Sequence, residues 1–396
     1  MKRVIVCILD SFGIGGAPDA AAYDDNGADT LGHIAKNYPL HIPNLLKNGL
    51  GEAYFMCNGR YPQGFNREEE PDGAYTYASE QSIGKDTPSG HWELMGLPVT
   101  TPWSLFPKEY PSFPSDILEK IAKEVNIDGF LGNYAASGTE ILKELGEKHL
   151  HLLSEGKALP IVYTSADSVM QIAAHEELFG LERLYRVCQK AREIMDDAGY
   201  MLGRVIARPF LGETSATFKR TPNRHDYSLP PPSPTILEYL AAQGKHITGI
   251  GKIYDIFAGK GITKKILASG NEDIFSVLVS EIKNNASAAV ILANFVDFDM
   301  LYGHRRDIKG YAKALEYFDS CLPKLKEAMR DDDILIITAD HGCDPDFKGV
   351  NHTRECIPVL ISGKNIQGKS LPPADSFCIV AKVINQHLAV NYSLSN

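Results

Sequence analysis

Three apolar runs are each followed by an acidic residue, at positions where side chains that do chemistry are often held. These residues are Asp10, Asp299 and Asp340, with His341 directly after Asp340, His304 five residues after Asp299, and His352 further along the chain. Carboxylate and imidazole groups are suitable ligands for Mn²⁺, Zn²⁺ or Mg²⁺. Six such ligands are enough for two ions, and two neighbouring ions can clamp the attacking and leaving oxygens of a phosphoryl displacement. The pattern therefore indicates metal-dependent phosphoryl chemistry.

Each of these residues also has a purely structural interpretation. Asp10 could cap a helix, which is a common role for aspartate after a strand. Asp340 and His341 could form a turn. Asp297 competes with Asp299 for the ligand role, because spacing alone does not separate them. The metal interpretation depends on the recurrence of these residues at the ends of three separate strands.

A polar segment with three glycines, SIGKDTPSGHWELMG over residues 82–96, holds a candidate nucleophile. Proline disfavours the helical region for the residue before it, so we expect Thr87 to be extended with its hydroxyl directed outward. A threonine hydroxyl is a poor nucleophile unless a metal ion or a base activates it. The alternative, which spacing alone favours, is that Thr87 or Ser89 caps a helix beginning near His91.

Alternating strand-like and helical patterns predict an α/β fold whose main sheet positions these groups. Continuous apolar runs predict buried strands at residues 4–9, 288–295, 334–338 and 358–361. Helical periodicity covers residues 115–125, 139–145, 181–198, 234–243, 273–284, 308–328 and 376–387. In open α/β sheets, catalytic groups collect beyond the carboxyl ends of the strands, and the candidate ligands stand at such ends.

Two proline-rich stretches, residues 98–114 and 220–234, divide the chain. Consecutive prolines favour stiff, extended connectors. We therefore expect a core made of residues 1–99 and 227–396, with residues 100–226 inserted as a smaller cap domain. The alternative is one continuous domain with proline-rich surface loops.

Composition excludes some classes of protein. The net charge is −10 and we find no run of Lys or Arg, which argues against a nucleic-acid-binding protein. The apolar run at residues 4–9 is too short for a signal peptide or a membrane span. Seven cysteines without a CxxC spacing argue against a disulfide framework or a cysteine zinc site, so we expect a cytoplasmic protein.

Motifs along residues 1–363 resemble, in order, the signature segments of phosphopentomutases, which belong to the alkaline phosphatase superfamily of metalloenzymes. The segments are LDSFGIGGAPDA, GADTLGHIA, GKDTPSGHWELMG, YTSADSVMQIAAHEE, ARPF, NRHDY, GKIYDIF, NFVDFDMLYGHRRD and TADHGCDPDFKGVNHTRE. The family often has DTxTGHWE where this chain has Ser89, which keeps the hydroxyl. The resemblance implies an alkaline-phosphatase-like core, with a central mostly parallel sheet flanked by helices, and an inserted α/β cap.

The resemblance also implies roles for individual residues. Asp10, Asp340 and His341 would hold one Mn²⁺, and Asp299, His304 and His352 would hold a second, which favours Asp299 over Asp297. Thr87 would lie between the two ions and carry the phosphoryl group. Asp167 would contact the sugar from the cap. Arg208, Arg224 and Lys252 are candidates for binding phosphate, with surface salt bridges as the alternative.

The implied activity is an isomerase that interconverts α-D-ribose 1-phosphate and D-ribose 5-phosphate, and their 2-deoxy equivalents. It would proceed through a phosphothreonine and a bound 1,5-bisphosphate, with glucose 1,6-bisphosphate or ribose 1,5-bisphosphate as activator. The expected partners are therefore small pentose phosphates; the oligomeric state stays open, and a monomer is compatible with the sequence. The rival functions are a metal-dependent phosphatase, a cofactor-independent phosphoglycerate mutase and a catalytically inactive binding protein.

Overall fold

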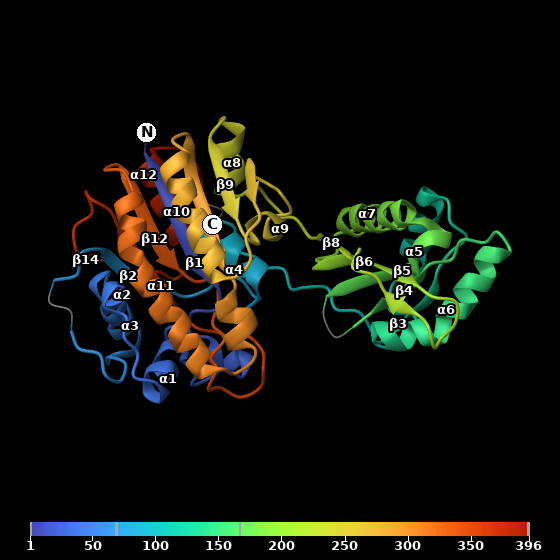
Figure 1. Ribbon diagram of the computed structural model, residues 1–396, viewed down its shortest axis with the longest axis horizontal. Coiled ribbons are helices and arrows are strands. Elements are labelled where there is room, and N and C mark those ends of the chain that lie inside the picture. The colour runs from blue at the N-terminus through green and yellow to red at the C-terminus, as the bar shows by residue number, and fades with distance from the viewer. Residues whose placement is uncertain (1, 68–69, 166–167, 394–396) are drawn as a thin grey trace. The chain divides into compact units, whose positions relative to one another are not determined.

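The computed structural model describes residues 2–67, 70–165 and 168–393, which form two units. The larger unit comprises Met1–Thr100 and Pro230–Asn396, and the smaller unit comprises Thr101–Leu229. Each unit has its own sheet and its own helices (Figure 1). We describe them one at a time.

The larger unit is built on an eight-stranded sheet whose central strands are wholly buried. β1 lies between β11 and β12 and pairs with both in parallel. β9 and β10 continue the parallel part, whereas β13 runs antiparallel to both β12 and β2. In spatial order the strands are β10 (Lys264–Ile266), β9 (His246–Ile250), β11 (Ala288–Phe295), β1 (Arg3–Leu9), β12 (Asp333–Thr338), β13 (Ile357–Ser362), β2 (Ala74–Ala78) and β14 (Lys369–Ser370).

Helices cover both faces of this sheet (Figure 1). α10 (Asn271–Asn284) packs on β9 and β11 and against α11 (Ile308–Ala328) on the side nearer the viewer, and α12 (Ile379–Leu388) packs on β1 from behind. Because helices cover both faces, the side chains on both faces of the central strands are buried, and these strands are continuous apolar runs in the sequence. The remaining helical segments of this unit are η1 (Ala20–Tyr23), α1 (Thr30–Asn37), α2 (Pro43–Lys47), α3 (Leu50–Asn58), α4 (Thr87–Leu94), α8 (Ile236–Ala242), α9 (Ile253–Ile256) and η3 (Phe298–Gly303).

The smaller unit holds a second mixed sheet with helices on both faces. Its strands are β3 (Leu131–Ala135), β4 (Ile161–Thr164), β5 (Val169–His175), β6 (Arg204–Leu211), β7 (Lys219–Arg220) and β8 (His225–Ser228). Met170 and Ile172 of β5 pack with α5 (Ser115–Val125) and α7 (Leu181–Asp197), whereas Ala173 packs with α6 (Gly138–Ser154). Alternate residues of the strand thus serve two cores, as the pleat requires. A π-helical turn, η2 (Glu176–Gly180), precedes α7.

The structure confirms the predicted α/β fold class, with a mostly parallel sheet flanked by helices, and refines several elements. β11, α5 and α11 have the predicted bounds. α6 continues to Ser154, well beyond the predicted end at residue 145. Gly146 obscures the helical pattern there, and the ring of Phe218 occupies the space that a Cβ at Gly146 would take. The short helices α1–α3 have no counterpart among the predicted elements.

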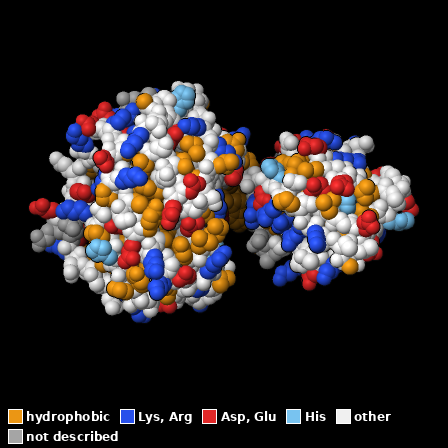
Figure 2. Space-filling model, viewed as in Figure 1, with side chains coloured by type: hydrophobic (Ala, Val, Ile, Leu, Met, Phe, Trp, Pro, Cys, Tyr) orange, Lys and Arg blue, Asp and Glu red, His pale blue; other side chains and the backbone are white. Residues whose placement is uncertain are grey.

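The charged side chains on the visible surface of the larger unit do not gather in one patch. Figure 2 shows acidic and basic side chains interspersed over the visible face of the larger unit. Among the helices in the described part of the chain, none combines the length and apolar character that crossing a bilayer would need.

A buried ion pair joins the two central strands at the end away from the candidate ligands. The Arg3 guanidinium donates to Asp333 and to the backbone carbonyls of Ile282 and Asn285. Asp333 also accepts hydrogen bonds from the backbone and side chain of Arg330. Burial alone would raise the pKa of Asp333, but the hydrogen bonds from Arg3 and Arg330 hold it below its ordinary value.

We predict that Asp333→Asn lowers the free energy of unfolding at pH 7 by about 3 kcal/mol, because it leaves the Arg3 charge buried without a counter-ion. Since the folded-state pKa of Asp333 is depressed, its contribution is present at neutral pH and is lost as the pH falls below about 4. Urea titrations at pH 7 and pH 3.5 measure both effects. The matched control is Asp331→Asn, which breaks only the exposed pair with Lys364 and should cost less than about 1 kcal/mol. Equal losses in the two variants would contradict the prediction.

Candidate active site

The candidate ligands lie beyond the carboxyl ends of three adjacent strands. Asp10 follows β1 directly, Asp340 and His341 follow β12, and Asp299 follows β11. β1 lies between the other two strands in parallel register, so all three ends meet at one edge of the sheet. The exposed fractions of Asp10, Asp340 and His341 are at most 1%.

A π-helical turn places the pair Asp299 and His304. Within η3 the N–H of His304 donates to the carbonyl of Asp299 at 3.1 Å, which is a bond across five residues. Such turns are rare and occur often at functional sites. This turn brings the two side chains together, with His304 Nε2 3.3 Å from Asp299 Oδ2.

Distances connect all six candidate ligands into one cluster, which we call the ligand cluster. His341 Nε2 lies 3.5 Å from Asp10 Oδ1 and 3.3 Å from Asp340 Oδ2. His352 Nε2 lies 3.3 Å from Asp299 Oδ1, and the His341 and His352 rings stack with their centroids 3.8 Å apart. Ligand atoms lie within 4.8 Å of one another in two sets, Asp299–His304–His352 and Asp10–Asp299–His341. Asp299 belongs to both sets and joins them.

Backbone carbonyls orient the three imidazoles. The Nδ1 atoms of His304, His341 and His352 bond to the carbonyls of Val350, Gly342 and Lys85, at 2.7, 3.1 and 2.8 Å. A carbonyl accepts, so each Nδ1 carries a proton, and in the neutral form of each ring Nε2 presents its lone pair to the cluster. This is the tautomer that metal coordination through Nε2 requires.

The electrostatics of the cluster are those of crowded, buried charges. Burial raises the pKa of Asp10 well above its ordinary value, and the neighbouring Asp340 and Asp299 add to this effect. Burial lowers the pKa of His341 to about 4. The hydrogen bond to Asp299 raises the pKa of His304 to about 11. Asp10 and His304 therefore favour their protonated forms, whereas buried His341 favours its neutral form, which is the form that binds a metal ion.

The residues fit divalent cations. Asp10 Oδ1, Asp299 Oδ1 and Asp340 Oδ2 are buried and receive no hydrogen bond from any described residue. His352 Nε2 and His304 Nε2 face each other at 3.1 Å, although both are bonded through Nδ1 to carbonyls. Buried acceptors without donors are costly, and cations bound to these atoms would satisfy them.

Thr87 is the first residue of α4, and its hydroxyl faces the ligand cluster. Its Oγ1 lies 3.2 Å from His341 Nε2. The predicted extended conformation of Thr87 is wrong, because the helix includes Thr87 and tolerates Pro88 in its first turn, where no intrahelical N–H is needed. The helix also begins earlier than His91, and its cap is Asp86 rather than Thr87 or Ser89. The Asp86 carboxylate accepts from both the N–H and the hydroxyl of Ser89.

Gly90 lets α4 approach the end of β12 closely. A Cβ at this position would lie 1.9 Å from the backbone oxygen of Asp340. No side chain fits there, so glycine is required if Thr87 is to reach the cluster.

Two residues outside the predicted set hold the carboxylates in place. Asn294 donates to Asp10 Oδ2 at 3.0 Å, and its amide nitrogen lies 3.2 Å from His91 Nε2. His91 Nδ1 lies 3.1 Å from Asp340 Oδ2 and 2.9 Å from the carbonyl of Thr87. His91 stands four residues after Thr87 on α4, a spacing that places both on one face and could have drawn attention to it.

Ser11 adds a strained turn behind Asp10. Its φ is +73°, an unfavourable conformation for a residue with a Cβ, and its N–H donates to Asp340 Oδ1 at 3.0 Å. Strain of this kind persists where the surrounding structure enforces it. Here it turns the chain after β1 so that Asp10 and Asp340 lie side by side.

The structural alternatives for two aspartates are decided by their contacts. The next helical segment after Asp10 is η1, which begins at Ala20, so Asp10 caps no helix. Asp297 Oδ2 accepts the N–H of Asn271 at the start of α10, whereas Asp299 lies in the ligand cluster.

The four predicted substrate-binding residues are distributed over both units. Lys252 follows β9 in the larger unit and is exposed, and its charge opposes the upward shift in the pKa of Asp10. Arg208 Nε donates to Gln171 in the smaller unit, while Arg224 forms a bidentate pair with Asp226 at 2.6 Å. Asp167 lies outside the described residues.

Three arginines of the smaller unit lie near Tyr163. Burial raises the pKa of Tyr163, and Arg208, Arg220 and Arg224 oppose this rise, so all three charges lie near the ring. Arg220 is absent from the predicted set. The sequence KRTPNR over residues 219–224 holds three basic residues and was a signal for it.

Comparison with known proteins identifies the family of this chain. A family model described as the metalloenzyme superfamily matches residues 2–392. The chain is 51% identical to a phosphopentomutase from Idiomarina loihiensis over 97% of this chain and 96% of that one. It is 49% identical to a phosphopentomutase from Proteus mirabilis, over 99% and 98% of the two chains. A solved phosphoglycerate mutase from Leishmania mexicana aligns over 99% of this chain and 96% of its own, at 13% identity and a TM-score of 0.49.

Identity near one half over almost the whole length of both chains leaves the family in no doubt. The chain belongs to the phosphopentomutase family, within the metalloenzyme superfamily.

Proposed function

We propose that this enzyme interconverts α-D-ribose 1-phosphate and D-ribose 5-phosphate, and the 2-deoxy equivalents, with Thr87 as the phosphoryl carrier. The observation that carries the proposal is the 3.2 Å contact between Thr87 Oγ1 and His341 Nε2, at the edge of a cluster of six candidate metal ligands. The names of the relatives support the substrate class.

The chemistry needs activation that Thr87 does not have alone. Two divalent cations, which we propose to be Mn²⁺, would supply Lewis-acid stabilisation of the phosphoryl oxygens and lower the pKa of the Thr87 hydroxyl. Asp10, Asp340 and His341 would hold one ion, and Asp299, His304 and His352 the other. The orphaned carboxylate oxygens and the orientation of the imidazoles support this assignment.

The reaction would proceed in two phosphoryl transfers. In the first, the bond between phosphorus and Thr87 Oγ1 breaks while the free hydroxyl of the sugar phosphate forms a new bond to phosphorus, giving a 1,5-bisphosphate. The hydroxyl proton released by the sugar is returned to the Thr87 oxygen over the step. In the second, Thr87 Oγ1 takes the other phosphoryl group, and the sugar oxygen regains a proton. Glucose 1,6-bisphosphate or ribose 1,5-bisphosphate would supply the first phosphoryl group.

Charged residues of both units would bind and orient the substrate. Lys252 and the arginines Arg208 and Arg224 are suited to phosphate, since a guanidinium fork matches two phosphate oxygens. Arg224 would have to exchange its partner Asp226 for the ligand. We assign Asp167 to the sugar and the smaller unit to a cap that excludes water, which would limit hydrolysis of the phosphoenzyme. All seven cysteines are unpaired, which supports a reducing compartment such as the cytoplasm.

Thr87→Ala should abolish the phosphoenzyme, because the acceptor oxygen is removed. After treatment with glucose 1,6-bisphosphate, intact-mass spectrometry should find one added phosphoryl group on the wild-type protein and none on the variant. Mutase activity should fall by ~10³-fold or more, the scale of losing a nucleophile. Ser89→Ala is the matched control, since the Ser89 hydroxyl bonds only Asp86 within the described contacts. Undiminished activity of Thr87→Ala would refute the proposal.

Asp299→Asn should reduce the metal content, because Asp299 contributes to both sets of ligand atoms. Elemental analysis should find two Mn²⁺ per chain in the wild type and at least one fewer in the variant, with activity lowered ~10²-fold or more. Asp297→Asn, two residues away and bonded to Asn271, should keep both ions. Two ions in Asp299→Asn would show that the ligand assignment is wrong.

The choice of acceptor separates a mutase from a phosphatase. Supplied with ribose 1-phosphate, Mn²⁺ and a priming bisphosphate, the enzyme should form ribose 5-phosphate with little free phosphate. Products resolved by ³¹P NMR decide between the two. Free phosphate without ribose 5-phosphate would establish a phosphatase, and turnover of 3-phosphoglycerate would point to a phosphoglycerate mutase.

A further inference from the structure

The segment before Thr87 has little regular structure of its own, and we call residues 80–86 the Thr87 loop. It follows β2 and precedes α4. Backbone carbonyls in such a segment need partners from elsewhere in the protein. The partners of this loop come largely from one side chain, that of Arg354.

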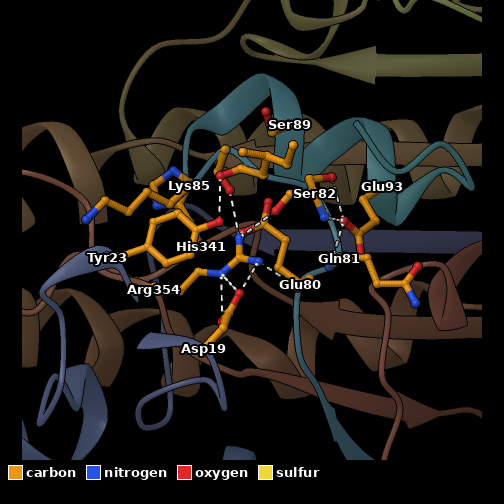
Figure 3. Close-up of polar contacts among 12 residues, drawn as sticks. Asp19, Tyr23, Glu80, Gln81, Ser82, Lys85, Ser89, Glu93, His341 and Arg354 are labelled. Carbon is orange, nitrogen blue, oxygen red and sulfur yellow. Dashed lines mark hydrogen bonds and ion pairs between the residues drawn. The ribbon is translucent and has the colours of Figure 1, made fainter. Parts of the chain in front are cut away.

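Arg354 is 2% exposed and uses its whole guanidinium group in this region. Its Nη1 and Nη2 donate to the carbonyls of Glu80, Ser82 and Gly84 at 2.7 to 2.8 Å. It also pairs with the carboxylates of Glu80 and Asp19 (Figure 3). Three carbonyls at alternate positions of the loop are thus held by one rigid fork.

Further contacts hold the loop, and together with those of Arg354 we call them the clamp. The carbonyl of Ile83 accepts from the hydroxyl of Tyr23 at 2.8 Å, and the Arg354 guanidinium lies 4.7 Å from the centre of the Tyr23 ring. On the opposite side, Glu93 of α4 accepts the N–H groups of Gln81 and Ser82 (Figure 3).

The same clamp reaches the ligand cluster. Arg354 stands two residues after His352, and the carbonyl of Lys85 in the loop accepts from His352 Nδ1 at 2.8 Å. The N–H of Arg354 and the ammonium of Lys85 both donate to Asp25 Oδ2. The segment that carries His352 and the loop that leads to Thr87 are therefore tied together at several points.

We propose that Arg354 is a positioning residue for phosphoryl transfer: it holds the Thr87 loop so that the Thr87 hydroxyl stays aligned with His341 and His352. The inference rests on the proposed role of Thr87. In this role Arg354 contacts none of the carboxylate oxygens of the ligand cluster and binds no substrate. Only arginine offers five donors in a planar fork, so lysine would keep the charge and lose the geometry.

Arg354→Lys tests this directly. A displacement of Thr87 by about 1 Å should lower kcat for ribose 1-phosphate about 10²-fold. The KM should stay within about threefold of wild type, because substrate binding is not removed, and two Mn²⁺ per chain should remain. Arg3→Lys is the matched control. Arg3 is also buried, but it lies at the end of β1 away from the ligand cluster. This control variant should lower the melting temperature and leave kcat per folded enzyme unchanged.

A milder variant covers the case in which Arg354→Lys does not fold. Tyr23→Phe removes only the bond to the carbonyl of Ile83, and Tyr239→Phe removes a comparable surface bond to the carbonyl of Asn391. We expect kcat to fall several-fold in Tyr23→Phe, on the order of one lost hydrogen bond, and not in Tyr239→Phe.

The outcomes separate the two proposals. The positioning role is overturned if Arg354→Lys keeps the wild-type kcat. It is also overturned if the kcat of Arg354→Lys per folded enzyme equals that of Arg3→Lys, because the lower activity would then reflect only lost stability. If only Tyr23→Phe can be measured and its kcat equals that of Tyr239→Phe, the role is likewise overturned. Full activity of Thr87→Ala would instead remove the phosphoryl-carrier role itself, whatever Arg354→Lys does.

Discussion

Three carboxylates buried side by side at one edge of the main sheet are the constraint on which the rest of the site depends. Asp10, Asp299 and Asp340 stand where they do because β1, β11 and β12 run parallel and end together. Two unit charges about 4 Å apart repel by ~4 kcal/mol at an effective dielectric constant of 20. Such a cluster is stable only with positive charge bound among its oxygens. The three imidazoles are oriented with Nε2 toward the carboxylates, so their neutral forms would be suitable ligands for such a charge.

The same constraint explains why so many surrounding groups are backbone atoms. A carbonyl holds an imidazole in one tautomer without adding another titratable group to a crowded site. The neutral amide of Asn294 likewise orients a ligand, because it donates to Asp10 without altering the total charge. The charged partners, Arg354 with Glu80 and Asp19, are kept one layer further out.

Much of this architecture could be predicted from the sequence, because it depends on strong local signals. The apolar run at residues 288–295 and the helical periodicity at residues 308–328 specify β11 and α11 at their observed bounds. The acidic residues after such runs suggested the ligand set, although spacing could not separate Asp297 from Asp299. That distinction depends on a π-helical turn, which has no clear sequence signal. The start of α4 was missed for a similar reason: the rule about residues before proline was outweighed by the Asp86 cap and by packing that only Gly90 permits.

The position of β1 has a consequence for how the chain comes together during synthesis. This strand precedes the other described strands in the chain, yet both of its neighbours, β11 and β12, are encoded about 280 to 330 residues later. The smaller unit, whose two apolar cores consist of residues within 101–229, can complete these cores in the meantime. The first strand must therefore remain unpaired on both edges while most of the protein emerges from the ribosome. Asp10 can meet Asp299 and Asp340 only after residue 340 has been made, so a chain truncated before β11 would carry an incomplete and exposed sheet rather than a weaker enzyme.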